Sequence, residues 1–419
     1  MGGREKDMPH IINTFEEHGE ALSFFAKNNY KNEVLLYFDQ HFDFKYIPPE
    51  KVNKVETSKA DFDALANLNR NIPFAEDTHS AYGLDNFLYI AAKLGYIKKL
   101  IWVIPEVSPL SVEDIAHYIL KIISLIPYAA KTFINTFKVT QTGVQAKIGI
   151  LDIEFTTLRR LKYLDISSIS KVDIDLDYFY NIHGQCLTDI DDFLVKMQEL
   201  NLLPAIHTLT YSISSGFLPQ QYRWLSTRIS KALSAHLEHS SRPLHGASAS
   251  METLALGKEI TTKGFNELYN TELEHLKGPG EVVKGLLSLQ MLNLSGAMQA
   301  YEQAIELGDR ATSLAYKIGL YFYNQKSFHE SSLWFLRAQG DLSDTMHLHS
   351  LTMQALAHAH ASDYENCLNL CLKAIDLTPL RLQNYNLGLF ACKKLGLKMP
   401  TINLENQFQK INHFYNKIV

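Results

Sequence analysis

The sequence predicts an α/β domain with a doubly wound, mostly parallel sheet, followed by an all-α domain of helical repeats. Residues 1–240 alternate short apolar runs with stretches of helical periodicity, a pattern typical of a parallel sheet with helices on both faces. From residue 275 onward the pattern is helical and repeats itself. A chain of 419 residues also exceeds the size of most single cores. We therefore expect two domains.

Six apolar runs are predicted to form the strands of the sheet, namely 10–15, 34–38, 99–104, 146–155, 171–179 and 205–213. Between them lie five stretches with the apolar spacing of helices, namely 20–28, 86–95, 112–126, 191–200 and 222–237. Ligand sites in sheets of this kind form at the carboxyl ends of the strands. Chemistry is therefore expected at that edge of the sheet.

A segment rich in Ser, Gly, Pro and Ala, residues 240–250, interrupts this alternation. Such a composition is typical of linkers and loops, and no strand-like run follows it. We therefore divide the chain into an α/β domain at 1–240, a linker and connecting helix at 241–274, and helical repeats at 275–419.

Small residues recur in the C-terminal part at separations of 34, 36 and 33, at Gly285, Gly319, Ala355 and Gly388. Another small residue follows each of the first three by nineteen positions, at Ala304, Ala338 and Ala374, and three positions before these lie Tyr301, Phe335 and Cys371. With Pro379, this spacing resembles the tetratricopeptide repeat, whose helix pairs bury their apolar faces only against neighbouring pairs. The usual Trp and most of the prolines are missing, so strict tetratricopeptide geometry is a finer prediction than a helical-repeat domain.

Composition and charge exclude several classes of protein. The net charge of −5 gives no reason to expect nucleic acid or a membrane surface as a partner. The N-terminus lacks the apolar core of a secretory signal, and no apolar run reaches the roughly 18 residues of a membrane-spanning helix. The four cysteines form neither a C-x-x-C pair nor a disulfide framework. We therefore expect reduced thiols and a cytoplasmic location.

The predicted strand 34–38 is followed by the motif D-x-H-x-D, formed by Asp39, His41 and Asp43. On an extended chain alternate residues point to one side, so two carboxylates and an imidazole would converge just past the strand. Without a counter-cation the carboxylates would repel each other and lose their hydration. A divalent metal ion removes both costs. The alternative is a strand end with solvated polar residues.

A second acidic segment, Lys171–Phe179, alternates Asp173, Asp175 and Asp177 with apolar residues. Three carboxylates on one face of a strand have no stabilising role without cations. Alone, this segment would suit Ca²⁺ or Mg²⁺. Together with D-x-H-x-D it indicates two metal ions bridged by shared carboxylates.

The two acidic motifs resemble those of the superfamily of arginases, agmatinases and histone deacetylases. Arginases combine D-x-H-x-D with a later D-x-D and take a further His from a loop before the first motif; here His18 lies 21 residues before Asp39. A closer resemblance is to an arginase-like family that includes the peptide arginases of ribosomal peptide natural-product pathways. Its four segments occur here in order, at Glu16–Leu22, Asp39–Asp43, Asn86-Phe87 leading into Ile101–Pro105, and Asp173–Phe179. The resemblance covers residues 10–235.

The resemblance implies a hydrolase that converts arginine side chains of a peptide to ornithine with release of urea. It implies two Mn²⁺ ions per chain, a metal suited to hard carboxylates with only two imidazoles. Such cations lower the pKa of a water molecule, which then attacks the guanidinium carbon. Asp175 is a ligand in either register of the second motif, and the implied ligands are His18, Asp39, His41, Asp43 and two of Asp173, Asp175 and Asp177.

Two further roles are needed. The leaving amine requires a proton, for which His79 is the first candidate and His183 the second, although the chain has 17 histidines and each has an ordinary structural explanation. The guanidinium requires a carboxylate acceptor. Arginases place a Glu shortly after a G-L-T-Y stretch, but none follows Thr208–Tyr211 here. The candidates for the acceptor are Glu17, Asp85 and Glu106.

Two other functions stay open. A deacetylase-like amide hydrolase would use a single Zn²⁺ and would leave His18 and Asp43 without a role. A non-catalytic repeat scaffold would need no metal. Because a concave helical array suits an extended peptide, we expect an arginine-containing precursor peptide as the partner, bound by residues 275–419.

Overall fold

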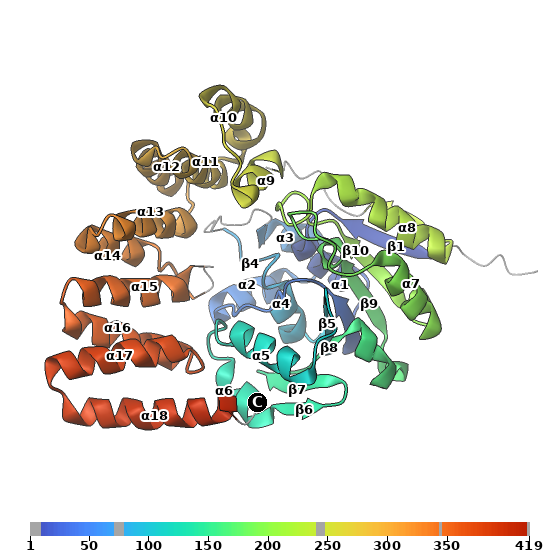
Figure 1. Cartoon of the computed structure of the whole chain (residues 1–419). Coiled ribbons are helices and arrows are strands. Elements are labelled where there is room, and N and C mark those ends of the chain that lie inside the picture. The colour runs from blue at the N-terminus through green and yellow to red at the C-terminus, as the bar shows by residue number, and fades with distance from the viewer. Residues whose placement is uncertain (1–9, 71–78, 240–247, 343–345, 417–419) are drawn as a thin grey trace, which may run out of the picture.

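The computed structural model describes residues 10–70, 79–239, 248–342 and 346–416 (Figure 1). Within these residues a nine-stranded sheet forms the centre of the α/β part. The strands lie in the order β11 (His236–His239), β1 (Ile11–Phe15), β10 (Ile206–Thr210), β9 (Lys171–Asp175), β2 (Glu33–Phe38), β5 (Ile97–Ile104), β8 (Leu151–Thr157), β7 (Gly143–Ile148) and β6 (Lys138–Thr140).

The sheet is mixed but mostly parallel, as predicted. The pairs from β11 through β8 are all parallel, whereas β7 and β6 add an antiparallel edge. A separate parallel pair joins β3 (Asn69–Arg70) and β4 (Tyr82–Gly83). Sequential strands that run parallel need crossover connections, and here helices supply them.

Two strand predictions were wrong in detail, and the edge strand β11 was not predicted. The run 146–155 is a hairpin, because Gly149 adopts a φ of +61° between β7 and β8 and reverses the chain. The run 171–179 stops being a strand at Asp175 and continues as the 3₁₀ turn η4 (Leu176–Tyr178). The first two residues of β11, His236 and Leu237, were assigned to the end of a helix.

Helices cover both faces of the sheet because successive strand residues point to opposite sides. On β2, Leu35 joins one hydrophobic cluster and Leu36 joins the other. The first face is covered by α1 (Ala21–Lys27), α2 (Pro49–Ser58), α3 (Phe62–Asn67), α4 (Phe87–Lys93), α5 (Val112–Ile123) and α6 (Ala130–Thr136). The second is covered by α7 (Ile190–Glu199) and α8 (Trp224–Leu233).

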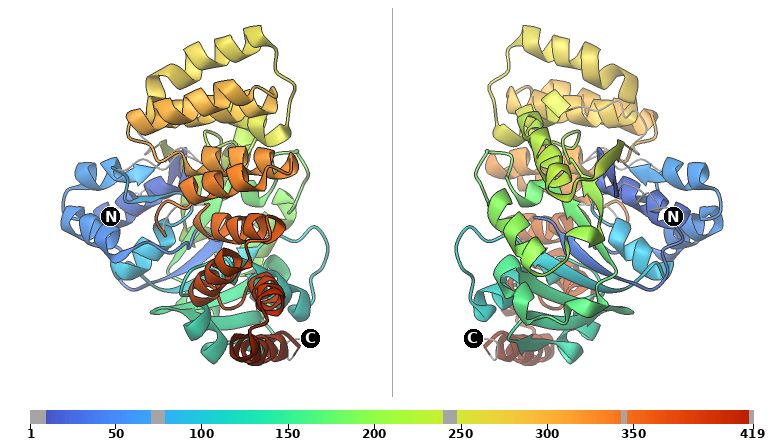
Figure 2. Two further views of the ribbon diagram at one scale, coloured as in Figure 1. Left: turned by 90° about the vertical axis from the view of Figure 1, so that its left-hand side faces the viewer. Right: turned by 90° about the vertical axis from the view of Figure 1, so that its right-hand side faces the viewer.

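The C-terminal part is an all-α stack in which consecutive helices pack against each other (Figures 1 and 2). Its helices are α11 (Gly278–Gln290), α12 (Leu294–Glu306), α13 (Thr312–Asn324), α14 (Phe328–Arg337), α15 (His347–His360), α16 (Tyr364–Leu377), α17 (Leu382–Leu395) and α18 (Lys398–Asn416). The predicted small residues lie where helices meet: a Cβ on Gly285 would come within 3.2 Å of Ala300, and one on Gly319 would overlap Phe335.

Along the chain, α9 (Ser248–Leu256) and α10 (Thr262–Leu268) follow the last strand and precede this stack. Residues 240–247 of the predicted linker are outside the described residues. The stack also packs directly on the α/β part, since Leu380 belongs to the core cluster of the sheet and the backbone N–H of Tyr128 donates to Leu377. The exact domain boundaries stay a prediction. Among the described helices, none combines the length and the apolar character that crossing a membrane requires.

Candidate metal centre

The acidic motifs converge at the carboxyl edge of four neighbouring strands. β1, β10, β9 and β2 are adjacent in the sheet, and the chain after β1 supplies His18 while the chain after β2 supplies Asp39. β9 ends at Asp175. Since parallel strands end at the same edge, residues far apart in sequence meet there. The predicted location of the chemistry therefore agrees with the structure.

One group of side chains that could hold a metal ion consists of His18, Asp39 and Asp175. All three are buried. Nδ1 of His18 lies 3.0 Å from Oδ2 of Asp39 and 3.2 Å from Oδ2 of Asp175. Oδ2 of Asp43 is 3.4 Å from the same nitrogen. Three carboxylate oxygens thus lie within 3.4 Å of one imidazole nitrogen. We call His18, Asp39 and Asp175 the first triad, with Asp43 beside it.

The second group, which we call the second triad, consists of Asp39, His41 and Asp177. Nδ1 of His41 lies 2.9 Å from Oδ2 of Asp177 and 3.6 Å from Oδ1 of Asp39. Although that Asp177 oxygen is buried, it has no hydrogen bond in suitable geometry among the described residues. The imidazole of His41 is 39% exposed, so the centre opens to its surroundings on this side. Asp39 belongs to both triads.

Asp173 lies outside both triads. Its Oδ2 is 3.1 Å from Nε2 of His18, the ring nitrogen that faces away from the first triad. Thr208 of β10 donates a hydrogen bond of 2.6 Å to its other oxygen. Asp173 therefore holds the imidazole in orientation, as carboxylates commonly do behind a metal-binding His.

The chain geometry that gathers these residues differs from the alternation we expected. β2 ends at Phe38, and Asp43 has a φ of +43°, so the D-x-H-x-D segment turns instead of running straight. Asp177 lies in η4, and its backbone N–H donates to Oδ1 of Asp175. These two turns bring the side chains together.

Sequence reasoning missed the groups that support the ligands. The hydroxyl of Tyr37 lies within hydrogen-bond distance of both Asp39 and, at 2.9 Å, Asp43, and can donate its one proton to either. Ser212, after β10, donates to Oδ2 of Asp175 at 2.5 Å. The indole of Trp102 donates to the backbone carbonyl of Asp39. Only Tyr37 had a signal in the sequence, because it lies two positions before Asp39 on the same face of β2.

Burial and neighbouring carboxylates oppose the ionisation of Asp43 and Asp177, whereas the imidazoles of His18 and His41 hold the pKa of the shared Asp39 well below its ordinary value. Burial raises the pKa of Asp43 to about 7, and the neighbouring Asp39 carboxylate adds to that shift. Burial, together with the charge of Asp175, raises the pKa of Asp177 well above its ordinary value. In the absence of cations, ionisation of the centre is therefore costly.

The two imidazoles respond in the opposite sense. Burial lowers the pKa of His18, but the carboxylates of Asp173, Asp175 and Asp39 together outweigh it, and the net pKa is well above the ordinary value. Burial likewise lowers the pKa of His41, but the carboxylates of Asp177 and Asp39 raise it, and the net pKa is well above the ordinary value. A cation bound here would replace these protons. Buried carboxylates, two inward-facing imidazole nitrogens and an Asp177 oxygen that accepts no hydrogen bond of suitable geometry fit a divalent metal ion.

The two predicted proton shuttles lie on the surface. His79, ahead of β4, is exposed, and its carbonyl accepts a hydrogen bond from Lys54. His183, in the loop after β9, is exposed too, and its backbone N–H donates to the Asn181 side chain. Neither belongs to a triad. Their catalytic roles stay predictions.

The three candidate acceptors for a guanidinium differ in the partners that their carboxylates already contact. Asp85 is paired with Lys45 and Arg70 at 2.9 and 2.7 Å. Oε1 of Glu106 accepts from the backbone of Leu110, and its buried Oε2 has no hydrogen-bond partner among the described residues. Glu17 is fully buried; its Oε1 accepts from the backbone of Ser215 at 2.6 Å, while its Oε2 has no hydrogen-bond partner among the described residues.

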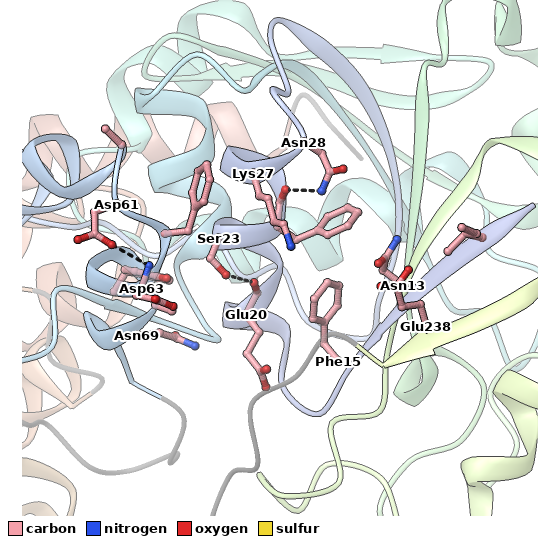
Figure 3. Close-up of a pocket in the computed structure, with 16 residues that line it drawn as sticks. Asn13, Phe15, Glu20, Ser23, Lys27, Asn28, Asp61, Asp63, Asn69 and Glu238 are labelled. Carbon is pink, nitrogen blue, oxygen red and sulfur yellow. Dashed lines mark hydrogen bonds between the residues drawn. The ribbon is translucent and has the colours of Figure 1, made fainter.

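A cavity of about 820 Å³ lies elsewhere, between β1, α1 and α3. Its walls carry Glu20, Lys27, Asp61 and Glu238 (Figure 3). None of the predicted site residues lines it, so we assign it no part in the chemistry of the centre.

Comparison with known proteins does not assign the chain to a family. No protein-family model matches the chain, and no curated protein matches it significantly. What is shown is an α/β fold with a helical C-terminal part and two buried His/Asp groups that could hold metal ions.

Proposed function

We propose that the chain is a two-metal hydrolase that removes the guanidinium group of arginine residues in a peptide, giving ornithine and urea. The observation that carries this proposal is the sharing of the buried Asp39 by the two triads. A shared carboxylate holds two cations close enough to act on one water molecule. Two divalent cations bound by these residues would supply a nucleophilic water near neutral pH.

The candidate ligands would then be divided between two metal sites. His18, oriented by Asp173, and Asp175 would complete the first site, with Asp43 beside them. His41 and Asp177 would complete the second. Hard carboxylates outnumber imidazoles in this set, which supports Mn²⁺ as the metal.

We assign the guanidinium acceptor to Glu17. It lies directly before His18, and the charge of Asp175 acts on it, so it is close to the first triad. Its unpaired, buried Oε2 offers an acceptor that a charged N–H donor would satisfy. Asp85 already contacts two cationic side chains, which makes it the weaker choice.

The number of metal ions also distinguishes this proposal from amide hydrolysis with a single Zn²⁺. A single-metal site would leave one of the two triads without a metal ion, and the buried carboxylate of Asp177 would then have only the His41 imidazole to offset its burial. The second triad therefore favours the arginase type over the deacetylase type.

The test is to incubate the Mn²⁺-loaded protein with an acetylated arginine-containing peptide. Urea should accumulate, and mass spectrometry should show arginine converted to ornithine. Asp39→Ala should abolish both, and an acetyl-lysine peptide should stay unchanged. Release of acetate by a protein with one bound Zn²⁺ would establish the alternative reaction. A protein that binds no metal and still binds peptide would be a scaffold.

A further inference from the structure

An apolar cavity of about 720 Å³ lies between the loop after β10 and the inner helices of the C-terminal stack. Sites that hold drug-sized ligands have volumes of roughly 300–1,000 Å³. The stack lies beside the α/β part in Figure 1, and the cavity is formed from both. Its walls include Phe217 of the loop, Leu286 and Leu289 of α11, and Tyr316 and Leu320 of α13.

The cavity borders the candidate metal centre through two residues of that loop. Phe217 lines the cavity, and its ring centroid lies 4.5 Å from that of His41. Ser215 also lines it, and its backbone N–H donates to Glu17. A ligand in the cavity would therefore touch residues that contact the second triad and the proposed guanidinium acceptor.

Gly216 shows how closely the loop approaches α9. It adopts a φ of +79°, and a Cβ there would lie 2.8 Å from Cβ of Met251. Only glycine tolerates both the left-handed backbone and this close contact. The cavity wall is therefore held by packing between the two parts of the chain.

The chemistry of the walls differs from that of the metal centre. Among the described residues that line the cavity there is no carboxylate, and apolar and aromatic side chains predominate. Burial lowers the pKa of His349 to about 4, so this side chain is neutral at pH 7. Lys317 is the single charged side chain among them. A cationic group is suited to the carboxylates of the centre, and an apolar group to the cavity.

We propose that this cavity binds a large apolar side chain adjacent in sequence to the reacting arginine, so that the enzyme selects peptides carrying an aromatic or aliphatic residue next to that arginine. The inference rests on the proposed function for the identity of the reacting residue. Free arginine has no group that would fill the cavity, whereas a neighbouring residue of a peptide supplies one. Burying such a side chain is a favourable and specific contribution to binding.

The test compares two labelled hexapeptides by fluorescence anisotropy with the full-length, Mn²⁺-loaded protein. Both have a central arginine, flanked by Phe and Leu in one and by Ser on both sides in the other. The Phe/Leu peptide should bind at least about tenfold more tightly. Leu320→Asp places a charge in the cavity and should remove that preference.

The matched control is Leu333→Asp on α14, where the side chain is 44% exposed and does not line the cavity. It should keep the preference. Mn²⁺ content and circular dichroism should be the same in all variants; if Leu320→Asp does not fold, Tyr316→Ser serves in its place. Equal binding of the two peptides by the unaltered protein, or a preference that survives in the cavity variant, would overturn the proposal.

Failure of the proposed reaction gives a different result. If the Phe/Leu peptide binds preferentially but no urea forms, the cavity assignment stands and the reaction is wrong. If urea forms from both peptides with the same KM, the reaction stands and the cavity assignment is wrong.

Discussion

Nε2 of His18 lies 3.1 Å from Oδ2 of Asp173, while Nδ1 of the same ring faces the carboxylates of Asp39 and Asp175. One imidazole therefore has an orienting contact on one side and the candidate ligands on the other. A carboxylate behind a metal-binding His fixes its tautomer and increases its basicity. This relationship favours Asp175 and Asp177 as the ligands of the second motif, with Asp173 as the residue that positions His18.

Removing the contact behind His18 should weaken metal binding without abolishing it. We expect Asp173→Ala to lower Mn²⁺ affinity about 10- to 100-fold, the usual effect of losing such a partner. Asp173→Asn keeps an acceptor for the imidazole N–H and should fall between Ala and the unaltered protein. Isothermal titration calorimetry measures both. Asp152→Asn, at an exposed carboxylate, is the control, and an Ala variant with unchanged affinity would refute the positioning role.

The number of bound ions should depend on which triad is altered. Asp39→Ala removes the residue shared by both triads, so we expect it to bind essentially no Mn²⁺. Asp177→Ala alters the second triad alone and should retain one ion per chain. Elemental analysis after removal of free metal gives the stoichiometry. Equal metal contents of the two variants would show that the triads do not act as separate sites.

The stability of the metal-free protein should fall as pH rises from about 4 to above 7. The pKa of Asp43 is raised from 3.8 to about 7, so the stability gained from its protonation in the folded state is complete below pH 3.8 and is lost as pH rises through 7. The pKa of His18 is also raised above 6.5, which adds a loss in the same direction at higher pH.

Saturating Mn²⁺ should remove most of this pH dependence, because the cation takes the place of the protons. Thermal unfolding followed by circular dichroism between pH 5 and pH 8, with and without metal, measures it. We expect the increase in Tm caused by Mn²⁺ to grow with pH. A constant increase across this range would contradict the pKa directions given above.

Replacing the proposed guanidinium acceptor should affect substrate more than metal. For Glu17→Gln we expect a KM for arginine peptides about tenfold higher or more, since a hydrogen bond to a charged group contributes about 1.5–3 kcal/mol. Mn²⁺ content should be unchanged. The same change at Glu106, the rival acceptor, should leave KM as it is. A Glu17 variant that loses metal with KM intact would instead indicate a structural role.

Local pattern was sufficient for the fold class and for the acidic motifs. Apolar runs of strand length and helical periodicity each reflect contacts within a few residues, so the α/β alternation and the helical C-terminal part could be predicted. The adjacency of acids to strand ends placed Asp39 and Asp175 at the correct edge of the sheet. The separation of β7 from β8 at Gly149 could not be predicted, because a short turn inside an apolar run leaves little trace in periodicity.

The sequence by itself determined which side chains could bind metal and at which edge of the sheet they lie. Only the tertiary structure decided that Asp173 contacts the outer nitrogen of His18, that the Tyr37 hydroxyl lies within hydrogen-bond distance of two candidate ligands, and that Phe217 joins the centre to a cavity. These relationships depend on the order β1, β10, β9, β2 and on the packing of the C-terminal helices against the loop after β10. Such contacts join residues distant in the chain, and no spacing within one segment encodes them.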